Sequence, residues 1–272
     1  MRAGPVGVFD SGLGGLSVLQ ALRAELPQQD FIYIADSGHA PYGERDAAHV
    51  IARSRAITTH LLDQGVQALV VACNTATAAA IDVLRADHPH LPIIGVEPAL
   101  KPAAALSQTR RIGVMATRGT LASSRFRALL ASLSGQAEFV LQPCDGLAEA
   151  IERSAGRPEN ATELIASCSR HTGAMGQFGL KPGEMDTLVL GCTHYPFAGA
   201  ALRTLLGPEV NFVDTGAPVA RQTRLRLPAA SSGGITEGSG QIRLFSTGQP
   251  GTLQTAVQRW LALDIPAAQL DL

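Results

Sequence analysis

The sequence predicts an α/β fold with mostly parallel sheets covered by helices. Short apolar runs alternate with stretches of helical periodicity along most of the 272 residues. This alternation is typical of parallel strands joined by helices. The runs are apolar throughout rather than at every second residue, which indicates strands buried on both faces. Four segments within the first hundred residues are also echoed further along the chain, in the same order, and this predicts two similar α/β units.

The predicted strands are short apolar runs bounded by turn residues. They lie at residues 6–9, 31–35, 68–72, 93–96, 112–115, 139–141, 187–190, 211–213 and 242–245. Amphipathic stretches predict helices at residues 15–26, 47–62, 75–87, 121–133, 159–171 and 252–263. In the second of these helices, Val50, Ile57 and Leu61 recur at helical spacing, so we expect them to face the core.

The internal repeat relates residues 7–10 to 113–116, 31–38 to 139–146, 68–75 to 187–194, and 96–97 to 213–214. It predicts two domains related by a pseudo-twofold, with an active site in the cleft between them. We expect the first domain to contain residues 1–98 and 212–272, and the second to contain residues 99–211. Residues 228–240, rich in Ser, Gly and Ala, predict a loop or linker. The strand and helix after it could join either sheet.

The composition excludes several classes of protein. With 46% hydrophobic and 17% charged residues, the chain is unlike a disordered one. Its formal net charge of −1 argues against nucleic-acid and anionic-membrane partners. Polar residues interrupt the most apolar region, 65–81, so no transmembrane helix is predicted. The sequence start lacks a signal-peptide core, and no C-x-x-C pair occurs. We therefore expect reduced thiols in a cytoplasmic protein.

Two of the four cysteines stand at matching positions of the repeat. Cys73 and Cys192 each end an apolar strand, and each is followed by a small polar residue and then by an expected helix. The unpaired N–H groups at the start of a helix stabilise a thiolate and can hold a carboxylate. A lone cysteine is usually a packing residue, which is our expectation for Cys144 and Cys168. The paired placement of the other two favours chemistry.

A pair of thiols suits racemisation at a carbon acid, because one group removes a proton from one face and the other delivers a proton to the opposite face. The carbanion-like transition state needs electrostatic stabilisation and exclusion of water. A pyridoxal enzyme uses a lysine Schiff base instead, and the only two lysines, Lys101 and Lys181, end no predicted strand. We expect no cofactor. The histidines lack ligand spacing, so we expect no metal site.

Polar residues follow the other predicted strands. Asp10 and Ser11 open a glycine-rich turn, where Asp10 is expected near Cys73 and Ser11 near a substrate. That turn lacks the third glycine of a dinucleotide-binding fingerprint, although Asp36 at the end of the second strand keeps this alternative open. Tyr42 and Gly43 lie in a loop suited to substrate contact. The sequence holds no G-x-S-x-G motif of a serine hydrolase.

Four motifs together resemble bacterial glutamate racemases. They are residues 7–18 (GVFDSGLGGLSV), 33–43 (YIADSGHAPYG), 73–77 (CNTAT) and 190–196 (LGCTHYP). The resemblance covers residues 5–215, and residues 245–263 resemble the last strand and helix of that family. It implies a cofactor-independent enzyme that interconverts L- and D-glutamate with two cysteines and supplies D-glutamate for peptidoglycan synthesis.

The resemblance implies a role for each matched residue. Cys73 would take the α-proton from D-glutamate with the help of Asp10. Cys192 would take it from L-glutamate, assisted by His194 with Glu152 behind it. The residues that would bind substrate are Asp10, Ser11, Pro41, Tyr42, Gly43, Asn74, Thr75, Thr117, Thr120, Thr193 and His194. The family also implies a homodimer.

Two alternatives from the same residues remain open. An aspartate racemase is a related enzyme that tends to carry Glu after the second Cys-Thr and to lack the Asp-Ser-Gly start. His194 and the pair Asp10–Ser11 count against it. A non-catalytic α/β protein that binds a small ligand is the alternative from another class. Such a protein needs neither Cys73 nor Cys192.

Overall fold

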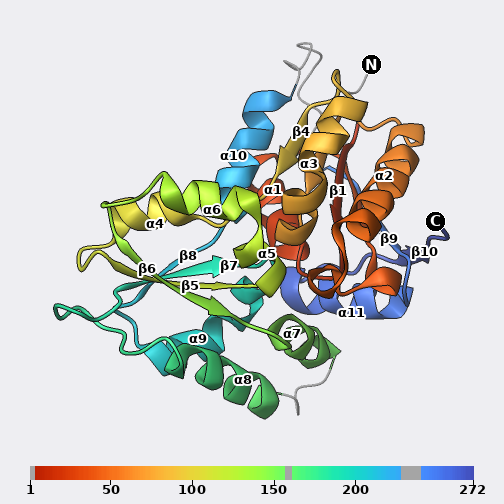
Figure 1. Ribbon diagram of the computed structural model, residues 1–272. Helices are drawn as coiled ribbons and strands as arrows, with labels where there is room; N and C mark the ends of the chain where they lie inside the picture. Colours follow the sequence, from red (N-terminus) through yellow and green to blue (C-terminus); the bar gives the residue numbers. More distant parts are fainter. Residues whose placement is uncertain (1–3, 157–160, 228–239) are drawn as a thin grey trace. The chain divides into compact units, whose positions relative to one another are not determined.

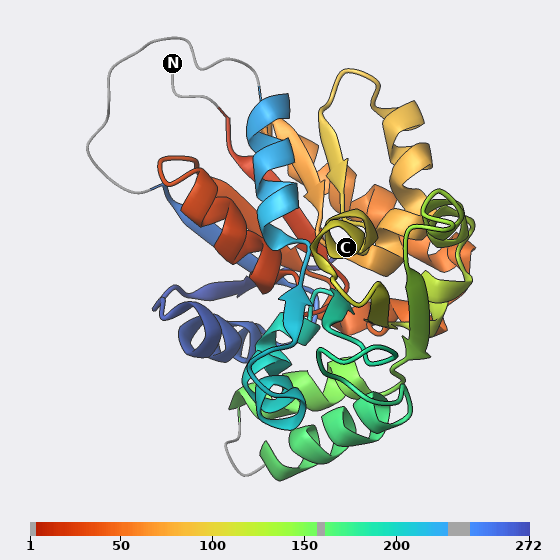
Figure 2. The same ribbon diagram turned by 90° about the vertical axis from the view of Figure 1, so that its left-hand side faces the viewer.

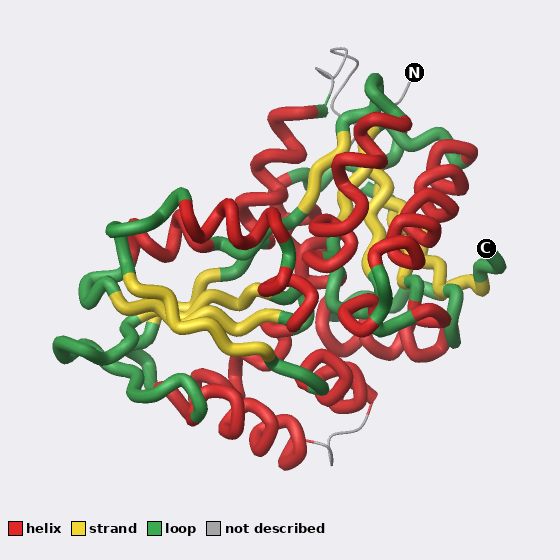
Figure 3. Tube along the Cα trace, viewed as in Figure 1, coloured by secondary structure: helices red, strands yellow, loops and turns green. Residues whose placement is uncertain are grey.

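The computed structural model describes residues 4–156, 161–227 and 240–272 (Figure 1). The chain forms two compact units, one of Met1–Val96 with Gly216–Leu272 and one of Glu97–Thr215. Each unit has its own parallel sheet with helices packed on it, which confirms the predicted fold class (Figure 3). The expected boundary before residue 212 is wrong by a few residues. Residue Phe212 pairs with Leu188 in the second sheet, so the chain returns to the first unit only after this strand.

The first unit contains a six-stranded sheet in the order β10-β9-β2-β1-β3-β4. Its strands are β1 (Val6–Asp10), β2 (Phe31–Ala35), β3 (Ala68–Val71), β4 (Ile93–Gly95), β9 (Ile242–Ser246) and β10 (Ala267–Gln269). Its helices are α1 (Leu16–Glu25), α2 (Ala47–Asp63), α3 (Asn74–Asp87), α10 (Gly216–Arg226) and α11 (Pro250–Leu261). Two short 3₁₀ turns, η1 (Ser37–His39) and η2 (Tyr42–Glu44), lie between β2 and α2.

The core of the first unit lies between its sheet and its helices. Helices α2 and α3 pack side by side, and α1 packs with α10 and α11 on the opposite face of the sheet (Figures 1 and 2). Val50, Ile57 and Leu61 lie on the buried face of α2, as their spacing predicts. Their cluster includes Phe9 and Cys73, so the apolar core extends to one of the candidate thiols.

The second unit contains a four-stranded sheet in the order β6-β5-β7-β8. Its strands are β5 (Arg111–Ala116), β6 (Glu138–Pro143), β7 (Thr187–Gly191) and β8 (Asn211–Val213). Its helices are α4 (Leu100–Leu106), α5 (Arg118–Ala122), α6 (Ser124–Ala131), α7 (Leu147–Gly156), α8 (Ala161–Gly173) and α9 (Gly199–Leu206), with the 3₁₀ turn η4 (Tyr195–Ala198). Helices α4 and α6 lie on one face of this sheet and α8 and α9 on the other (Figure 1).

The two sheets confirm the internal repeat. The strands that the sequence relates are β1 with β5, β2 with β6, β3 with β7, and β4 with β8. The orders β2-β1-β3-β4 and β6-β5-β7-β8 are therefore the same. The first unit adds β9 beside β2 and β10 beside β9. The last predicted strand and helix accordingly belong to the first unit.

Several elements differ from expectation. The helix expected at residues 121–133 is two helices, because Ser123 interrupts it and caps α6 by accepting a hydrogen bond from the N–H of Phe126 at 3.1 Å. Helices α4 and α10 and strand β10 were not predicted. Residues 228–239 of the expected loop lie outside the described residues. Among the described helices, none combines the length and the apolar character that crossing a membrane requires.

One buried carboxylate fixes the entry into β7. Asp186 is 1% exposed. It accepts hydrogen bonds from Ser107 Oγ at 2.6 Å and from the N–H groups of Gln108 and Thr109 at 2.6 and 3.0 Å. Burial alone raises the pKa of Asp186, but these bonds outweigh burial and hold that pKa below its usual value. The stability that it contributes is therefore present above the unfolded pKa and lost as pH falls through the folded pKa.

We expect the change Asp186→Asn to lower the free energy of unfolding by about 1–3 kcal/mol at pH 7, because an amide cannot accept all three bonds. In the unaltered protein, part of the fall in the free energy of unfolding at acid pH comes from protonation of Asp186. The variant should lack that part. Urea unfolding at pH 7 and at pH values through the acid range measures both effects. Glu209→Gln, at an exposed position of the same unit, is the control; an equal loss in that variant contradicts the assignment.

Candidate active site

The predicted site residues form two clusters, one within each unit. The Cys73 cluster consists of Asp10, Ser11, Cys73 and Asn74. The Cys192 cluster consists of Glu152, Cys192 and His194. Each cluster lies at the carboxyl ends of the parallel strands of its own sheet, where ligands bind in folds of this type.

Asp10 is the last residue of β1 and is fully buried. Its carboxylate accepts hydrogen bonds from the N–H of Ser11 at 2.7 Å and from the N–H of Gly15. Gly15 lies so close to β1 that an added Cβ would stand 2.7 Å from the Cβ of Asp10 and 3.0 Å from the hydroxyl of Tyr33. The glycine at position 15 of this turn is therefore explained by its close packing on Asp10.

Cys73 lies just after β3 and is the N-cap residue of α3. Its sulfur accepts a hydrogen bond from the N–H of Ala76 at 3.4 Å and lies 3.5 Å from Ser11 Oγ. Ser11 Oγ is in turn 3.3 Å from Asp10 Oδ1. The hydroxyl thus stands between thiol and carboxylate. Cys73 therefore stands at the start of a helix, where backbone N–H groups favour negative charge on a sulfur.

Asn74 follows Cys73 in the first turn of α3 and is 5% exposed. Neither atom of its side-chain amide has a hydrogen-bond partner within the described chain, although both atoms are buried. Buried polar atoms without partners are uncommon, and each costs about 1–3 kcal/mol. A bound polar ligand would satisfy this amide. The next residue, Thr75, is half-buried.

Pro41, Tyr42 and Gly43 belong to the loop of residues 37–46, which we name the Tyr42 loop. The side chain of Tyr42 is buried and donates a hydrogen bond to Asp36 Oδ2 at 2.5 Å. The bonds within the turn η2 are donated by Glu44 and Arg45. The N–H groups of Tyr42 and Gly43 stand at the start of that turn, where helical N–H groups have no partner in the helix.

The Cys192 cluster is a chain of three residues joined by two contacts. Cys192 follows β7, and its sulfur lies 3.6 Å from Nδ1 of His194. Nε2 of His194 lies 2.7 Å from Oε1 of Glu152 on α7. Cys192 and His194 are 7% and 6% exposed. An imidazole held between a thiol and a carboxylate can pass or hold a proton at the sulfur.

The charge state of His194 follows from its neighbours. Burial by itself lowers the pKa of His194, but the hydrogen bonds and charges of Cys192 and Glu152 outweigh burial and raise that pKa well above its usual value. His194 is therefore an imidazolium at neutral pH. Nδ1 of His194 lies 3.6 Å from the sulfur, so the imidazole is placed to exchange a proton with Cys192.

The expectation of a helix directly after Cys192 is wrong. Residues 195–198 form the 3₁₀ turn η4, and α9 starts only at Gly199. Pro196 occupies the start of that turn and cannot donate the backbone hydrogen bond of a helix interior. The two sulfurs therefore have different neighbours. Cys73 contacts the N-terminus of α3, whereas Cys192 contacts the imidazole of His194.

The remaining predicted residues of the second unit lie close in sequence to its strand ends. Thr117 caps α5, and its Oγ1 donates a hydrogen bond to Thr120 Oγ1 at 2.9 Å. Thr120 and Thr193 are 2% and 3% exposed. Thr117 follows β5 and Thr193 follows β7, and these two strands are neighbours in the sheet.

Burial raises the pKa of Cys144 to about 12 and that of Cys168 to about 11. Both are therefore thiols at neutral pH, in keeping with packing roles. Lys101 and Lys181 are exposed. Within the described ranges, no group of three or more His, Cys, Asp or Glu side chains could hold a metal ion.

Two residues at the Tyr42 loop were missed by sequence reasoning. Arg53 on α2 and Thr247 after β9 both contact Asp36. From the sequence, Asp36 was considered only as a residue that could bind a dinucleotide. Arg53 lies on an amphipathic helix in which arginines are ordinary surface residues. Nothing in its immediate sequence indicates that it turns toward a buried carboxylate.

Comparisons with known proteins agree with this geometry. The model of the Asp/Glu/Hydantoin racemase family matches residues 16–223. A glutamate racemase of Ectopseudomonas mendocina is 46% identical over 265 residues, which is 97% of this chain and 92% of that relative.

Solved structures give the same result. A glutamate racemase from Bacillus anthracis superposes with a TM-score of 0.84 at 28% identity, covering 100% of this chain and 99% of that one. Glutamate racemase from Escherichia coli, in complex with L-glutamate and the activator UDP-MurNAc-ala, superposes with a TM-score of 0.83 at 30% identity. That comparison covers 98% of each chain.

Proposed function

The chain belongs to the Asp/Glu/hydantoin racemase family, and from this membership we propose that it interconverts L- and D-glutamate. One observation carries the proposal. Cys73 and Cys192 follow β3 and β7, which are equivalent strands of two sheets with the same strand order. Each sulfur contacts a polar group that in turn contacts a carboxylate. Duplicated thiols of this kind suit a reaction that needs both a base and an acid.

The proposed reaction moves one proton at each of two sulfurs. From D-glutamate, the thiolate of Cys73 takes the α-proton, so that the Cα–H bond breaks and an S–H bond forms. The thiol of Cys192 then gives its proton to the opposite face of the carbanion and becomes a thiolate. The reverse direction starts with Cys192 as the thiolate. No net proton is gained or lost in either direction.

The surrounding groups supply charge and substrate contacts. Asp10 acts on Cys73 through the hydroxyl of Ser11 and assists its proton transfer. His194, which contacts Glu152, assists proton transfer at Cys192. The unsatisfied amide of Asn74 supports its assignment to a polar group of the substrate. The N–H groups at the start of η2 offer a carboxylate a site of the kind that helix starts provide. The further contacts that we assign to substrate are Ser11, Pro41, Thr75, Thr117, Thr120 and Thr193.

The same proposal places the reaction in the cytoplasm as a source of D-glutamate for peptidoglycan synthesis, in a homodimer. The names of the similar racemases support the substrate. Three residues separate this proposal from an aspartate racemase: His194, which lies beside Cys192, and the pair Asp10 and Ser11 in the Cys73 cluster.

We expect the purified protein to convert either pure enantiomer of glutamate to an equal mixture without an added cofactor. In D₂O the α-position should become deuterated as racemisation proceeds, because the delivered proton comes from a thiol that exchanges with solvent. Circular dichroism follows the loss of optical activity, and proton NMR follows the loss of the α-proton.

Two outcomes would contradict the proposal. Racemase activity that appears only after pyridoxal phosphate is added would contradict the two-thiol mechanism. Faster racemisation of aspartate than of glutamate under the same conditions would assign the chain to the related aspartate enzymes.

A further inference from the structure

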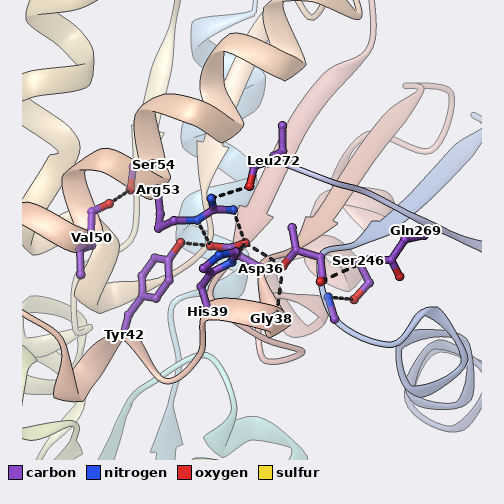
Figure 4. A network of polar contacts seen from close by, with 12 residues as sticks. Asp36, Gly38, His39, Tyr42, Val50, Arg53, Ser54, Ser246, Gln269 and Leu272 are labelled. Carbon is purple, nitrogen blue, oxygen red and sulfur yellow. Dashed lines mark hydrogen bonds and ion pairs between the residues drawn. The ribbon is translucent and has the colours of Figure 1, made fainter.

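A buried ion pair lies beside the Tyr42 loop. Asp36 follows β2 and is fully buried. Arg53 on α2 approaches its carboxylate with two nitrogens (Figure 4). Nε donates to Oδ2 at 3.0 Å and Nη2 donates to Oδ1 at 2.8 Å. This forked arrangement is the most directional contact that an arginine makes with a carboxylate. The pair therefore holds α2 and the end of β2 in one geometry.

Tyr42 attaches the loop to this pair. Burial and the neighbouring Asp36 raise the pKa of Tyr42, so its phenol stays protonated and donates to the carboxylate. Burial raises the pKa of Asp36, but the bonds from Arg53, Tyr42 and Thr247 outweigh burial and lower that pKa below its usual value. The aromatic side chain is thus an anchor. It leaves the backbone N–H groups of Tyr42 and Gly43 as the parts of the loop suited to bind substrate.

The third nitrogen of Arg53 reaches the last residues of the chain. Nη1 donates to the backbone oxygen of Leu272 at 3.0 Å (Figure 4). Two residues earlier, the N–H of Leu270 donates to the backbone oxygen of Ser246 at 2.9 Å. The side chain of Leu270 is 8% exposed and lies in the same apolar cluster as Tyr42. Residues 267–272 are therefore joined to Arg53 by a hydrogen bond and share an apolar cluster with Tyr42.

Thr247 completes the connection between these parts. Its hydroxyl donates to Asp36 Oδ1 at 2.8 Å and accepts from the N–H of Gly38 at 3.1 Å. Gly38 itself fits closely, since an added Cβ would stand 2.6 Å from the backbone oxygen of Thr247. Gln269 Nε2 donates to that same oxygen at 3.4 Å. The contacts form a closed ring from Asp36 through Arg53 and residues 267–272 back to Asp36.

We propose that Arg53 and residues 267–272 are positioning elements that hold the Tyr42 loop in the conformation that binds substrate. Among the described hydrogen bonds and ion pairs, none joins Arg53 or residues 267–272 to Cys73 or Cys192. Their effect on the reaction passes through Asp36 and Tyr42 to the N–H groups of Tyr42 and Gly43. The inference rests on the proposed function, which assigns those groups to the substrate.

Two variants test the inference. Arg53→Lys keeps the positive charge but cannot form the fork and the contact with Leu272 together. Removal of Asp271 and Leu272 leaves β10 and Leu270 in place but takes away the acceptor of Nη1. We expect KM for both enantiomers of glutamate to rise about tenfold in Arg53→Lys and about threefold in the shortened chain, with kcat within about twofold, because the loop's binding contribution is lost rather than the proton transfer.

A control separates positioning from general stability. Leu61→Ala removes a buried side chain two turns further along α2, in the same apolar cluster. It is expected to lower the melting temperature while KM stays unchanged. An unchanged KM in both test variants, or an equal rise of KM in Leu61→Ala, overturns the inference.

Hydrogen–deuterium exchange gives a readout that does not depend on glutamate activity. The peptide covering residues 37–46 should exchange faster in Arg53→Lys and in the shortened chain than in Leu61→Ala. If the unaltered protein fails to racemise glutamate but this difference appears, the proposed function fails and the positioning role stands. If the unaltered protein racemises glutamate and the exchange of this peptide is the same in all variants, the positioning role fails alone.

Discussion

Replacement of Cys192 by alanine is expected to reduce glutamate racemisation by about 10³- to 10⁴-fold in both directions, and Cys73→Ala should do the same. A positioned proton-transfer group contributes about 10²- to 10⁴-fold, and a racemase needs two such groups in every turnover. Loss of either group therefore stops the reaction from L- as well as from D-glutamate. Circular dichroism on each pure enantiomer measures the loss.

A half-reaction distinguishes the two cysteines. A glutamate analogue with chloride at the β-carbon loses HCl once its α-proton is removed, and the enamine product hydrolyses to 2-oxoglutarate and ammonium. This irreversible elimination needs one base only. Cys192→Ala should retain elimination from the D-configured analogue, where Cys73 is the base, and lose it from the L-configured analogue. Cys73→Ala should show the opposite preference.

The other buried cysteines offer a matched control. Cys168 on α8 is fully buried, and its thiol is far from ionisation at neutral pH because burial raises its pKa to about 11. Cys168→Ala should therefore keep its racemase activity while losing some stability. Full racemisation by Cys73→Ala or Cys192→Ala, or a loss in Cys168→Ala as large as theirs, would rule out the assignment of the two thiols.

The fold was predictable to the extent that apolar pattern determines it. Strand β2 has the predicted bounds because five consecutive buried residues are bounded by polar ones. Strand β10 was missed because Ala267–Gln269 is short and partly exposed, and it is a strand only because β9 offers it a partner edge. Helix α10 was missed for a similar reason. Its sequence is rich in arginine, and what holds it is packing against α1.

The candidate site was predictable where its residues stand at strand ends. Asp10 and Cys73 meet through Ser11 because β1 and β3 are adjacent in the sheet, an adjacency that local sequence does not encode. The contact of Glu152 with His194 depends on how α7 packs beside η4, so the sequence could only suggest it through the resemblance. Nothing in the sequence around Arg53 predicts that it contacts Asp36.

The carboxylate behind His194 makes a second large prediction. Glu152→Gln is expected to lower kcat from L-glutamate by about 10- to 100-fold at pH 8. This is at or below the lower end of the roughly 10²- to 10⁴-fold that a positioned acid–base group contributes, because Glu152 acts through His194. The amide can still accept a hydrogen bond from Nε2, but it carries no charge, so the pKa of His194 falls toward its ordinary value. The imidazolium beside Cys192 is then lost at lower pH. The alkaline limb of the pH–rate profile should move to lower pH, as measured by kcat at closely spaced pH values.

The same pair makes a linked prediction about stability. Because the folded pKa of His194 is raised above the ordinary 6.5, its contribution to the free energy of unfolding is full below pH 6.5 and is lost as pH rises through the folded pKa. Glu152→Gln should lose the part of that decline that the charge of Glu152 causes. Glu149→Gln, one turn earlier on α7, removes an exposed carboxylate that pairs only with Arg153 among the described contacts, and it should change neither profile. If the rate and stability profiles of Glu152→Gln coincide with those of Glu149→Gln, the carboxylate does not control the protonation of His194, and Cys192 must be activated by other means.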